Sequence, residues 1–368
     1  LVAGRATDRR RRVAVNAAAD VAEARLLDDG QAPELATPVR STALGTPGWY
    51  VDFAQASLNG FWGDYIAKKN GRLDLGMTLR HHGRPLSVTR ESLADAFPNP
   101  TPKVCVFVHG LASTEWLWSL SSEAYYGNPE VTFGTRLLED AGFTPVYVRY
   151  NSGLHISENG KRLAALLEEL LDAYPVPIDE IALVGHSMGG LVSRSAAHYG
   201  SQHDARWVKR LRHVACIGSP HLGAPLEKAV HLLTGALNRI DAAGAQVPAE
   251  LLKARSVGVK DLRFGYTLDE EWLGKDLDAV FAGARKNVPL VDGVGYYFVA
   301  ATITKDPAHP FGHLFGDLLV RMPSAAGAAP EPARRIHFDG GALVRGLNHV
   351  NIASHPAVYD ALRGLLAA

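Results

Sequence analysis

The stretch Ile181-Ala-Leu-Val-Gly-His-Ser-Met-Gly-Gly190 decides the fold of this chain. Its first four residues are apolar and partly β-branched, which predicts a short buried strand. The motif G-x-S-x-G follows from Gly185 to Gly189, and Leu191 to His198 continues with the spacing of a helix. A serine on so sharp a strand-to-helix turn is held above the sheet edge, at a helix N-terminus that favours negative charge. We therefore interpret Ser187 as a candidate nucleophile rather than as part of an ordinary tight turn.

The composition is that of a globular protein with balanced charge. The 368 residues include 38 basic and 38 acidic side chains, so no electrostatic argument favours a nucleic-acid partner. This length allows one large α/β domain with additions, or two domains. No apolar run is long enough to span a bilayer. The only two cysteines, Cys105 and Cys216, lie in predicted buried strands, so we expect core thiols, with a disulfide between them left open.

The N-terminal end carries a basic run, Arg9 to Arg12. A twin-arginine export signal would continue with an apolar stretch, but Val13 to Leu27 contains charged residues and predicts an amphipathic helix. The chain begins at Leu1 rather than Met, which leaves a processed signal upstream open. From these patterns we expect a cytoplasmic location.

The rest of the first hundred residues also differs in pattern from the later part of the chain. Residues 31–48 are rich in Pro, Thr and Gly and predict a linker, whereas residues 50–69 have apolar side chains at helical spacing. Leu73 to Leu79 alternates as a strand. The adjacent His81 and His82 have no third ligand nearby in sequence, so we expect a surface turn rather than a metal site.

From Pro102 onward, apolar strands alternate with helices. This pattern predicts a parallel sheet covered by helices on both faces, with the chemistry at the carboxyl ends of the strands. The expected domains are an N-terminal extension (1–100), mostly helical with a linker, and an α/β catalytic domain (101–368). The expected strands are Val104–Val108, Pro145–Arg149, Ile181–Val184, Val214–Gly218, Tyr296–Thr302 and Arg335–Phe338. The expected helices include Thr132–Ala141, one capped by Ser157 and running to Tyr174, and a terminal one from Pro356 to Leu366.

Nucleophilic serine chemistry also needs two donors for the oxyanion. The strand Val104–Val108 runs into His109-Gly-Leu-Ala112. We predict that the backbone amide of Leu111, together with that of Met188 after the nucleophile, forms this pair of donors. Since backbone supplies the chemistry here, His109 is interpreted as a histidine that packs the loop.

The base must lie on the loop after the last strand to reach the serine. Among fifteen histidines, His349 occupies that place, because it follows the predicted strand Arg335–Phe338 and the loop from Asp339 to Leu347. His355, at the start of the terminal helix, is the chief competitor. His337, inside the predicted strand, is expected to be structural.

The acidic partner of the base is predicted to be Asp317. It lies in the long loop that follows the strand Tyr296–Thr302. Asp306 competes because it lies nearer the strand end, and Asp339 is a more distant alternative. A loop aspartate is often only a solvated turn residue, so this assignment depends on order and spacing.

A helical insertion is expected over the site. Residues 226–294 show no strand pattern, and Leu226 to Ile240 carries an apolar stripe. A cap with an apolar inner face would suit an acyl chain and exclude water. A permanently packed insert is the alternative to a moving lid. The stripe could also make transient contact with a lipid surface, although it lacks a polar face rich in Lys and Arg.

Five motifs together resemble the α/β-hydrolase superfamily, and more narrowly its bacterial lipase and carboxylesterase members, including the GPI-inositol-deacylase-like group. The resemblance covers about Lys103 to the C-terminus and implies a triad of Ser187, Asp317 and His349, with Leu111 and Met188 as oxyanion donors. Members often have Gly after such an Asp and Pro or a similar residue where Arg321 stands, whereas this chain has Leu318 and Arg321. The motifs are His109-Gly-Leu, Gly185-His-Ser-Met-Gly-Gly, Ile217-Gly-Ser-Pro-His-Leu-Gly-Ala-Pro225, Gly316-Asp-Leu-Leu-Val and Asn348-His-Val-Asn-Ile-Ala-Ser-His-Pro.

These residues lead us to expect an α/β-hydrolase core that cleaves carboxylic esters through an acyl-enzyme. The substrate would be a small-molecule or lipid ester, with no cofactor and no metal. Acyl transfer to an alcohol, cleavage of a polyester or amide, and a non-catalytic binding role on the same scaffold remain alternatives. The sequence indicates neither the oligomeric state nor the acyl-chain length.

Overall fold

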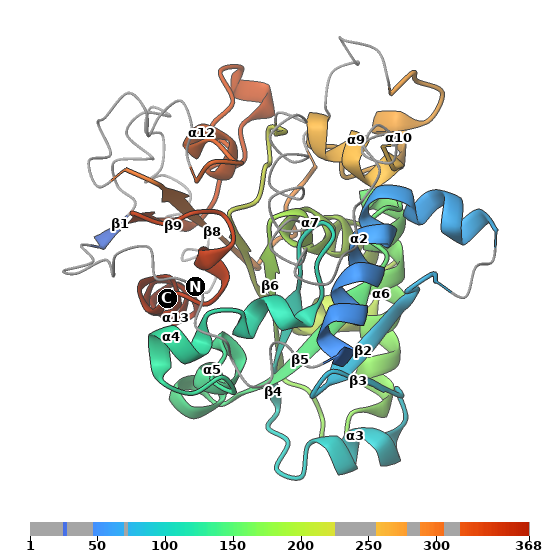
Figure 1. The fold of residues 1–368 in the computed structure, drawn as a ribbon, viewed down its shortest axis with the longest axis vertical. Coiled ribbons are helices and arrows are strands. Elements are labelled where there is room, and N and C mark those ends of the chain that lie inside the picture. The colour runs from blue at the N-terminus through green and yellow to red at the C-terminus, as the bar shows by residue number, and fades with distance from the viewer. Residues whose placement is uncertain are drawn as a thin grey trace, which may run out of the picture.

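The structure is a computed structural model that describes residues 25–27, 47–69, 73–224, 255–277, 288–304 and 317–367. A nine-stranded sheet forms its centre (Figure 1). The strand order is β1-β9-β8-β7-β6-β4-β5-β2-β3. The strands are β1 (Arg25–Leu27), β2 (Met77–His81), β3 (Arg84–Leu86), β4 (Lys103–Val108), β5 (Phe143–Tyr150), β6 (Glu180–His186), β7 (Leu211–Ile217), β8 (Gly295–Thr302) and β9 (Gly340–Arg345).

The sheet is mostly parallel, as the alternating pattern predicts. All neighbours from β1 to β5 in the spatial order pair in parallel, whereas β2 is antiparallel to β5 and β3 is antiparallel to β2. Strand β4 has β5 on one side and β6 on the other, so the chain reverses its direction across the sheet at β4. Ligands of open α/β sheets bind outside the carboxyl ends of strands at such a switch point.

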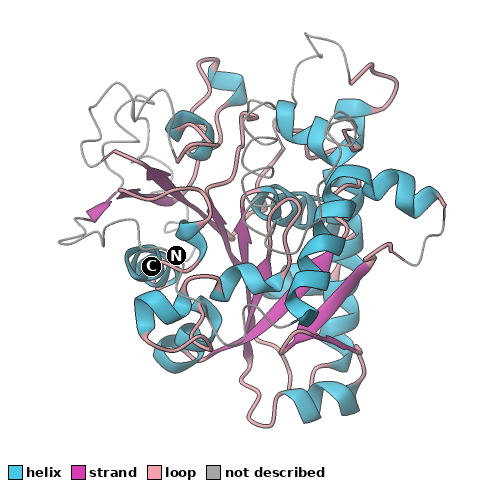
Figure 2. Cartoon of the chain, in the orientation of Figure 1, coloured by secondary structure: helices cyan, strands magenta, loops and turns pink. Residues whose placement is uncertain are grey.

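Helices cover both faces of the sheet (Figure 2). Val104, Val106 and Val108 of β4 pack with α6 and α7, whereas Cys105 and Phe107, which point the other way, pack with α5 and α13. This alternation is what a strand buried on both faces requires. The α-helices are α2 (Pro47–Lys68), α3 (Arg90–Ala96), α4 (Ser122–Tyr126), α5 (Phe133–Ala141), α6 (Ile156–Ala173), α7 (Met188–Gln202), α9 (Val257–Phe264), α10 (Asp269–Trp272), α12 (Met322–Ala325) and α13 (Pro356–Leu366). The 3₁₀ helices are η2 (Glu115–Ser119), η3 (Arg206–Arg210), η6 (Pro332–Arg334) and η7 (Asn351–Ala353).

The last predicted strand is wrong. Residues 335–338 form no strand, and the final strand is β9, which contains Gly340 and Gly341 and pairs with β8. Glycine weakens strand patterns in sequence, but a Cβ on Gly341 would collide with the ring of Phe298 on β8. Consequently His337 lies outside any strand and is exposed, not structural as predicted. The other predicted core strands are confirmed within a few residues.

Two helix predictions also need correction. The N-cap of α6 is His155 rather than Ser157, and the first amide of the helix, that of Ile156, donates to the Asp261 carboxylate at 2.9 Å. Asp261 belongs to α9, so this cap is a long-range contact that local sequence does not reveal. The predicted helix Val13–Leu27 falls mostly outside the described residues, but its last three residues form strand β1 instead.

The first hundred residues contribute to the same sheet as the rest. The predicted helix over residues 50–69 is confirmed as α2, and β2 and β3 extend the sheet beyond β5. Strand β2 begins at Met77, four residues later than the predicted strand, and His82 and Gly83 form the expected turn. The division of the chain at residue 100 remains a prediction.

The predicted cap is described only in part. The stripe Leu226–Ile240 lies outside the described residues, whereas residues 255–277 hold α9 and α10. Leu262 of α9 joins the main core, and Trp272 of α10 stacks on His155 with ring centroids 3.6 Å apart. Among the described helices, none combines the length and apolar character needed to cross a membrane.

Candidate active site

The turn between β6 and α7 has the geometry of a nucleophile elbow. Ser187 adopts φ +54° and ψ −121°, a strained conformation for a residue with a side chain. The flanking glycines allow it: a Cβ on Gly185 would collide with the backbone of Gly189, and one on Gly189 with the carbonyl oxygen of Val108. The Ser187 amide donates to the Ile217 carbonyl at 2.8 Å, which ties the turn to β7. The predicted nucleophile thus lies where β4, β6 and β7 end.

The structure brings together the predicted base and acid. The Nδ1–H of His349 donates to Oδ2 of Asp317 at 2.7 Å. The other carboxylate oxygen, Oδ1, accepts from the amides of Leu319 at 3.0 Å and Val320 at 2.7 Å. Both side chains are almost fully buried, Asp317 at 1% and His349 at 5% relative exposure. The Nε2 atom of His349 is buried and has no hydrogen-bond partner among the described residues.

His349 is connected to the elbow through His186, the residue of β6 that directly precedes Ser187. The Nε2–H of His186 donates to the backbone carbonyl of His349 at 2.8 Å, and the two rings lie 4.8 Å apart. Burial lowers the pKa of His186 to about 3, so this imidazole stays neutral at ordinary pH. Gly218 lies against the same pair, since a Cβ there would stand 3.4 Å from both Oδ2 of Asp317 and Cε1 of His349.

The predicted oxyanion loop, residues 109–112, also lies beside Ser187. A Cβ on Gly110 would stand 3.0 Å from Cβ of Ser187. The Nδ1–H of His109 donates to the carbonyl of Gly110 at 2.8 Å, and its Nε2 accepts from the amide of Tyr150 at 3.3 Å. That carbonyl belongs to the same peptide unit as the amide of Leu111, so His109 orients the predicted donor. The second predicted donor, Met188, is the first residue of α7, where amides lack intrahelical acceptors.

The competing candidates for the base and the acid either make structural contacts or lie outside the described residues. His355 is the N-cap of α13, and its Nδ1 accepts from the amide of Ala357 at 3.2 Å. Asp339 accepts from the amide of Tyr296 at 2.8 Å, which ties the start of β8 to the approach to β9. Asp306 lies outside the described residues. Neither His355 nor Asp339 takes part in the contact between Asp317 and His349.

Two residues beside the site were not predicted from the sequence. Ser152 accepts from the amide of Ala112 at 2.9 Å, and Asn151 donates from Nδ2 to the carbonyl of Gly63 at 3.0 Å. Both are buried polar residues at the carboxyl end of β5. Polar residues directly after a buried parallel strand were the available signal, because such strand ends surround the site in this class of fold.

The remaining candidate ligand groups lie apart from this site. Within the described residues, no cluster of three or more His, Cys, Asp or Glu side chains could hold a metal ion. Cys105 and Cys216 are both buried free thiols.

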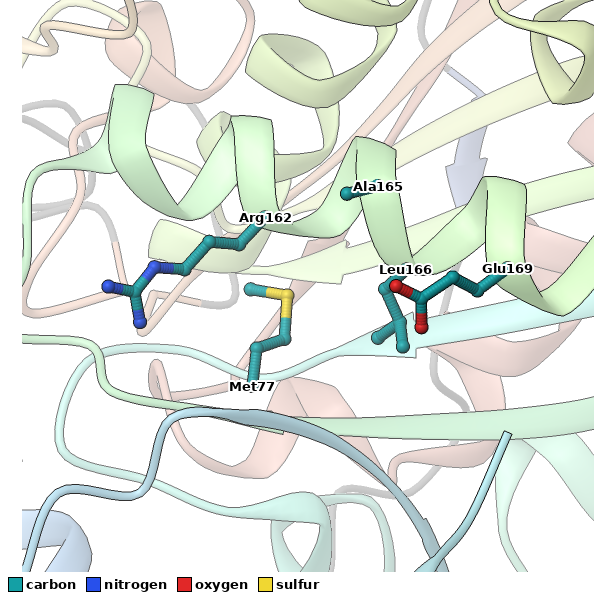
Figure 3. A pocket seen from close by; sticks show the side chains of 5 residues that line it. All are labelled: Met77, Arg162, Ala165, Leu166 and Glu169. Carbon is teal, nitrogen blue, oxygen red and sulfur yellow. The ribbon is translucent and has the colours of Figure 1, made fainter. Parts of the chain in front are cut away.

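A surface hollow of about 240 Å³ lies between β2 and α6 (Figure 3). Its lining consists of Met77, Arg162, Ala165, Leu166 and Glu169, so none of the predicted site residues contributes to it.

Residues 99–261 match the model of a protein family described as "Putative serine esterase (DUF676)". The matched span includes Ser187, Leu111 and Met188 and ends before Asp317 and His349. The match agrees with the resemblance to bacterial esterases and supports a serine hydrolase at the coarse level. No curated protein sequence matches the chain.

Several solved structures are similar to this chain. The mature form of the lipase BlEst2 from Bacillus licheniformis is 19% identical, with a TM-score of 0.45 over 73% of this chain and 94% of that chain. The RedJ thioesterase from the prodiginine biosynthetic pathway in Streptomyces coelicolor is 21% identical, with a TM-score of 0.37 over 74% and 98%. The phospholipase PlaB from Legionella pneumophila is 16% identical, with a TM-score of 0.42 over 72% and 60%.

Proposed function

We propose that this protein hydrolyses carboxylic esters through an acyl-enzyme formed on Ser187. The observation that carries the proposal is the state of His349. Its Nδ1–H is bound to Asp317 at 2.7 Å, while its buried Nε2 has no partner among the described residues. An imidazole held in this tautomer has its lone pair on Nε2 and is therefore prepared to accept a proton.

In the first half of the reaction, Nε2 of His349 accepts the proton of the Ser187 hydroxyl as Oγ attacks the ester carbonyl. The carbonyl π electrons move to oxygen and give a tetrahedral oxyanion. When the oxyanion collapses, the bond to the alkoxy group breaks, and His349 gives its proton to the departing alcohol. In the second half, a water molecule attacks the acyl carbonyl and gives a proton to His349. When this second oxyanion collapses, the bond between the acyl carbon and Oγ breaks, His349 returns the proton to Ser187, and the carboxylic acid leaves.

The amides of Leu111 and Met188 would stabilise the oxyanion in both halves. Preorganised donors of this kind often make the largest single contribution to acyl transfer. The neutral His109, whose pKa burial lowers to about 3, supports this assignment because it donates to the carbonyl of the Gly110–Leu111 peptide. The oxyanion would therefore meet amides that are already oriented.

Carboxylic esters of small molecules or lipids are the proposed substrates. The apolar residues of the predicted cap favour an acyl chain. The catalytic alternatives differ from ester hydrolysis only in the group that receives or releases the acyl group. Product analysis with and without an added alcohol separates hydrolysis from acyl transfer. The same triad could cleave a polyester or an amide, and these are compared directly with simple esters.

The first test is hydrolysis of p-nitrophenyl esters with acyl chains from short to long. The wild type should be active, and Ser187→Ala should lose at least about 10³-fold in kcat. Ser193→Ala is a matched control, because it removes another buried hydroxyl of α7, one that donates to the carbonyl of Gly189 at 2.8 Å. The control should keep its activity. Equal inactivity of wild type and Ser187→Ala on every ester would refute the ester-hydrolase proposal and favour a binding role.

A further inference from the structure

Helix α2 lies outside the segment that matches the esterase family, yet it packs directly on the oxyanion loop. A Cβ placed on Gly60 of α2 would stand 2.6 Å from Cβ and 2.9 Å from Cα of Ala112. Ala112 follows Leu111, the predicted oxyanion donor, and its φ of +52° lies in the left-handed region. Only a glycine at position 60 permits this approach without displacing Ala112.

The same turn of α2 is hydrogen-bonded to the loop after β5, residues 151–152, which also binds Ala112. The amide group of Asn151 donates to the carbonyl of Gly63, and the next residue, Ser152, accepts from the amide of Ala112. At Trp62, between the two glycines, α2 departs from helical geometry with φ −129° and ψ 17°. The helix is thus bent where it meets the strand ends.

Two further contacts hold α2 in place, one near its start and one at Gly60. Near its start, Asp52 accepts from Nη1 and Nη2 of Arg149 at 2.8 and 2.7 Å, and from Nε1 of Trp116 at 3.0 Å. From the cap side, the hydroxyl of Ser256 donates to the carbonyl of Gly60 at 2.6 Å. The helix is therefore fixed at its start and at Gly60.

We propose that α2 is a positioning element of the oxyanion hole, with Gly60 setting the place of Ala112 and thereby the direction of the Leu111 amide. This inference rests on the ester-hydrolase function proposed above. A donor stabilises the oxyanion only at about 2.7–3.1 Å from it, so a shift of a few tenths of an ångström weakens binding of the transition state. The ester itself carries no such charge, so its ground-state binding should be unaffected.

The test is Gly60→Ala, measured on protein whose active sites have been titrated with a fluorophosphonate. With a p-nitrophenyl ester, kcat should fall about tenfold or more while KM stays within about twofold. The affinity for an aryl trifluoromethyl ketone, which forms a tetrahedral oxyanion adduct, should fall by the same factor as kcat. The double variant Gly60→Ala/Ala112→Gly removes the contact with Cβ at 2.6 Å but keeps the contact with Cα at 2.9 Å, so it should recover part of both losses. Leu58→Ala, on the exposed side of α2, is the control and should behave as wild type.

The outcomes separate this inference from the proposed function. If the wild type hydrolyses esters and Gly60→Ala keeps wild-type kcat and ketone affinity, α2 is only a packed helix and the inference is wrong. A lowered melting temperature with unchanged kinetics leads to the same conclusion. If Gly60→Ala yields no folded protein, Asp52→Asn takes its place, with an expected parallel fall of about threefold in kcat and ketone affinity. Unchanged kinetics in that variant would likewise overturn the inference, whereas an inactive wild type would remove both proposals.

Discussion

Asp317 and His349 are joined twice, once through their side chains and once through their backbones. The Nδ1–H of His349 donates to Oδ2 of Asp317 at 2.7 Å, and the backbone amide of His349 donates to the carbonyl of Asp317 at 3.0 Å. Asp317 therefore holds both the main chain and the ring of His349, although it lies more than thirty positions earlier in the sequence. This double connection explains how two loops hold an imidazole in a fixed orientation.

Replacing the carboxylate should separate the roles of the two connections. Asp317→Asn keeps the backbone contact, but its amide cannot hold His349 in the tautomer that leaves Nε2 unprotonated. We expect kcat to fall about 10³- to 10⁴-fold with little change in KM and in melting temperature. Asp339→Asn and Asp306→Asn are the controls. If either control lost activity and Asp317→Asn did not, the assignment of the acid would have to move.

The choice between His349 and His355 can be tested in the same assay. His349→Ala should abolish ester hydrolysis, because no other described imidazole is bound to Asp317. His355→Asn should keep kcat within about twofold, because asparagine is a good N-cap and can accept from the Ala357 amide as His355 does. Both variants should unfold at temperatures within a few degrees of the wild type. Activity in His349→Ala would show that the base lies elsewhere.

Leu318, directly after Asp317, adopts φ +83°, a conformation that favours glycine. It is 44% exposed, so its side chain gains little from burial. Leu318→Gly should therefore raise the free energy of unfolding by about 0.5–1 kcal/mol in urea titrations, with kcat preserved. Leu138→Gly, at an exposed position within α5, should instead lower it by about 1 kcal/mol. Equal destabilisation by both changes would show that the backbone of Leu318 is not strained.

Two buried histidines should make the fold sensitive to acid. Burial lowers the pKa of His109 and of His186 to about 3, whereas an unfolded histidine has a pKa of about 6.5. Between these values only the unfolded state binds the protons, so the stability is present above pH 6.5 and is lost as the pH falls toward 3. Each histidine should cost about 2 kcal/mol between pH 7 and pH 5.

The measurement is the difference in unfolding free energy between pH 7 and pH 5, taken from urea titrations. In His109→Asn this difference should shrink by about 2 kcal/mol relative to the wild type, because one of the two groups is gone. An undiminished pH dependence in His109→Asn would contradict a neutral, buried His109.

Two arginines offer a matched comparison of buried and exposed ion pairs. Arg149 binds both Asp52 and Glu115, and its side chain is 3% exposed. Arg149→Met would leave Asp52 without its ion-pair partner and Glu115 with Arg80 alone, and should destabilise the fold by about 3–5 kcal/mol. Arg206 binds Glu168 and Asp172 on the surface with its side chain 57% exposed, so Arg206→Met should change the stability far less than Arg149→Met. Similar losses in thermal unfolding for the two variants would argue against a special role of the buried cluster.

The strands that the sequence reveals are those whose residues face apolar neighbours on both sides. Val104 to Val108 and Ile181 to Val184 were found because a parallel strand under two layers of helices must be apolar throughout. Strand β9 was missed because Gly340 and Gly341 carry no such signal, and the space that Gly341 leaves is used by Phe298. The position of β9 is therefore determined by a contact between two strands and not by a local apolar pattern.

The candidate site shows the same division between local and distant causes. Ser187 was predictable because its strain is produced within one motif, and its place between β6 and α7 agrees with that prediction. The roles of Ser187, Asp317 and His349 remain predictions, although the contact between the last two agrees with them. The approach of Gly60 to Ala112 could not be predicted, because it depends on a helix about fifty residues earlier that packs through the absence of a side chain.

The carboxylate of Asp261 links the stability of α9 to that of α6. It accepts the first amide of α6 and the imidazole of His155, yet it belongs to α9. Lifting α9 would therefore uncap α6 as well, and the cost of the motion would be shared between two helices. Asp261 thus couples the stability of α9 to that of α6, so the two helices should unfold together rather than separately.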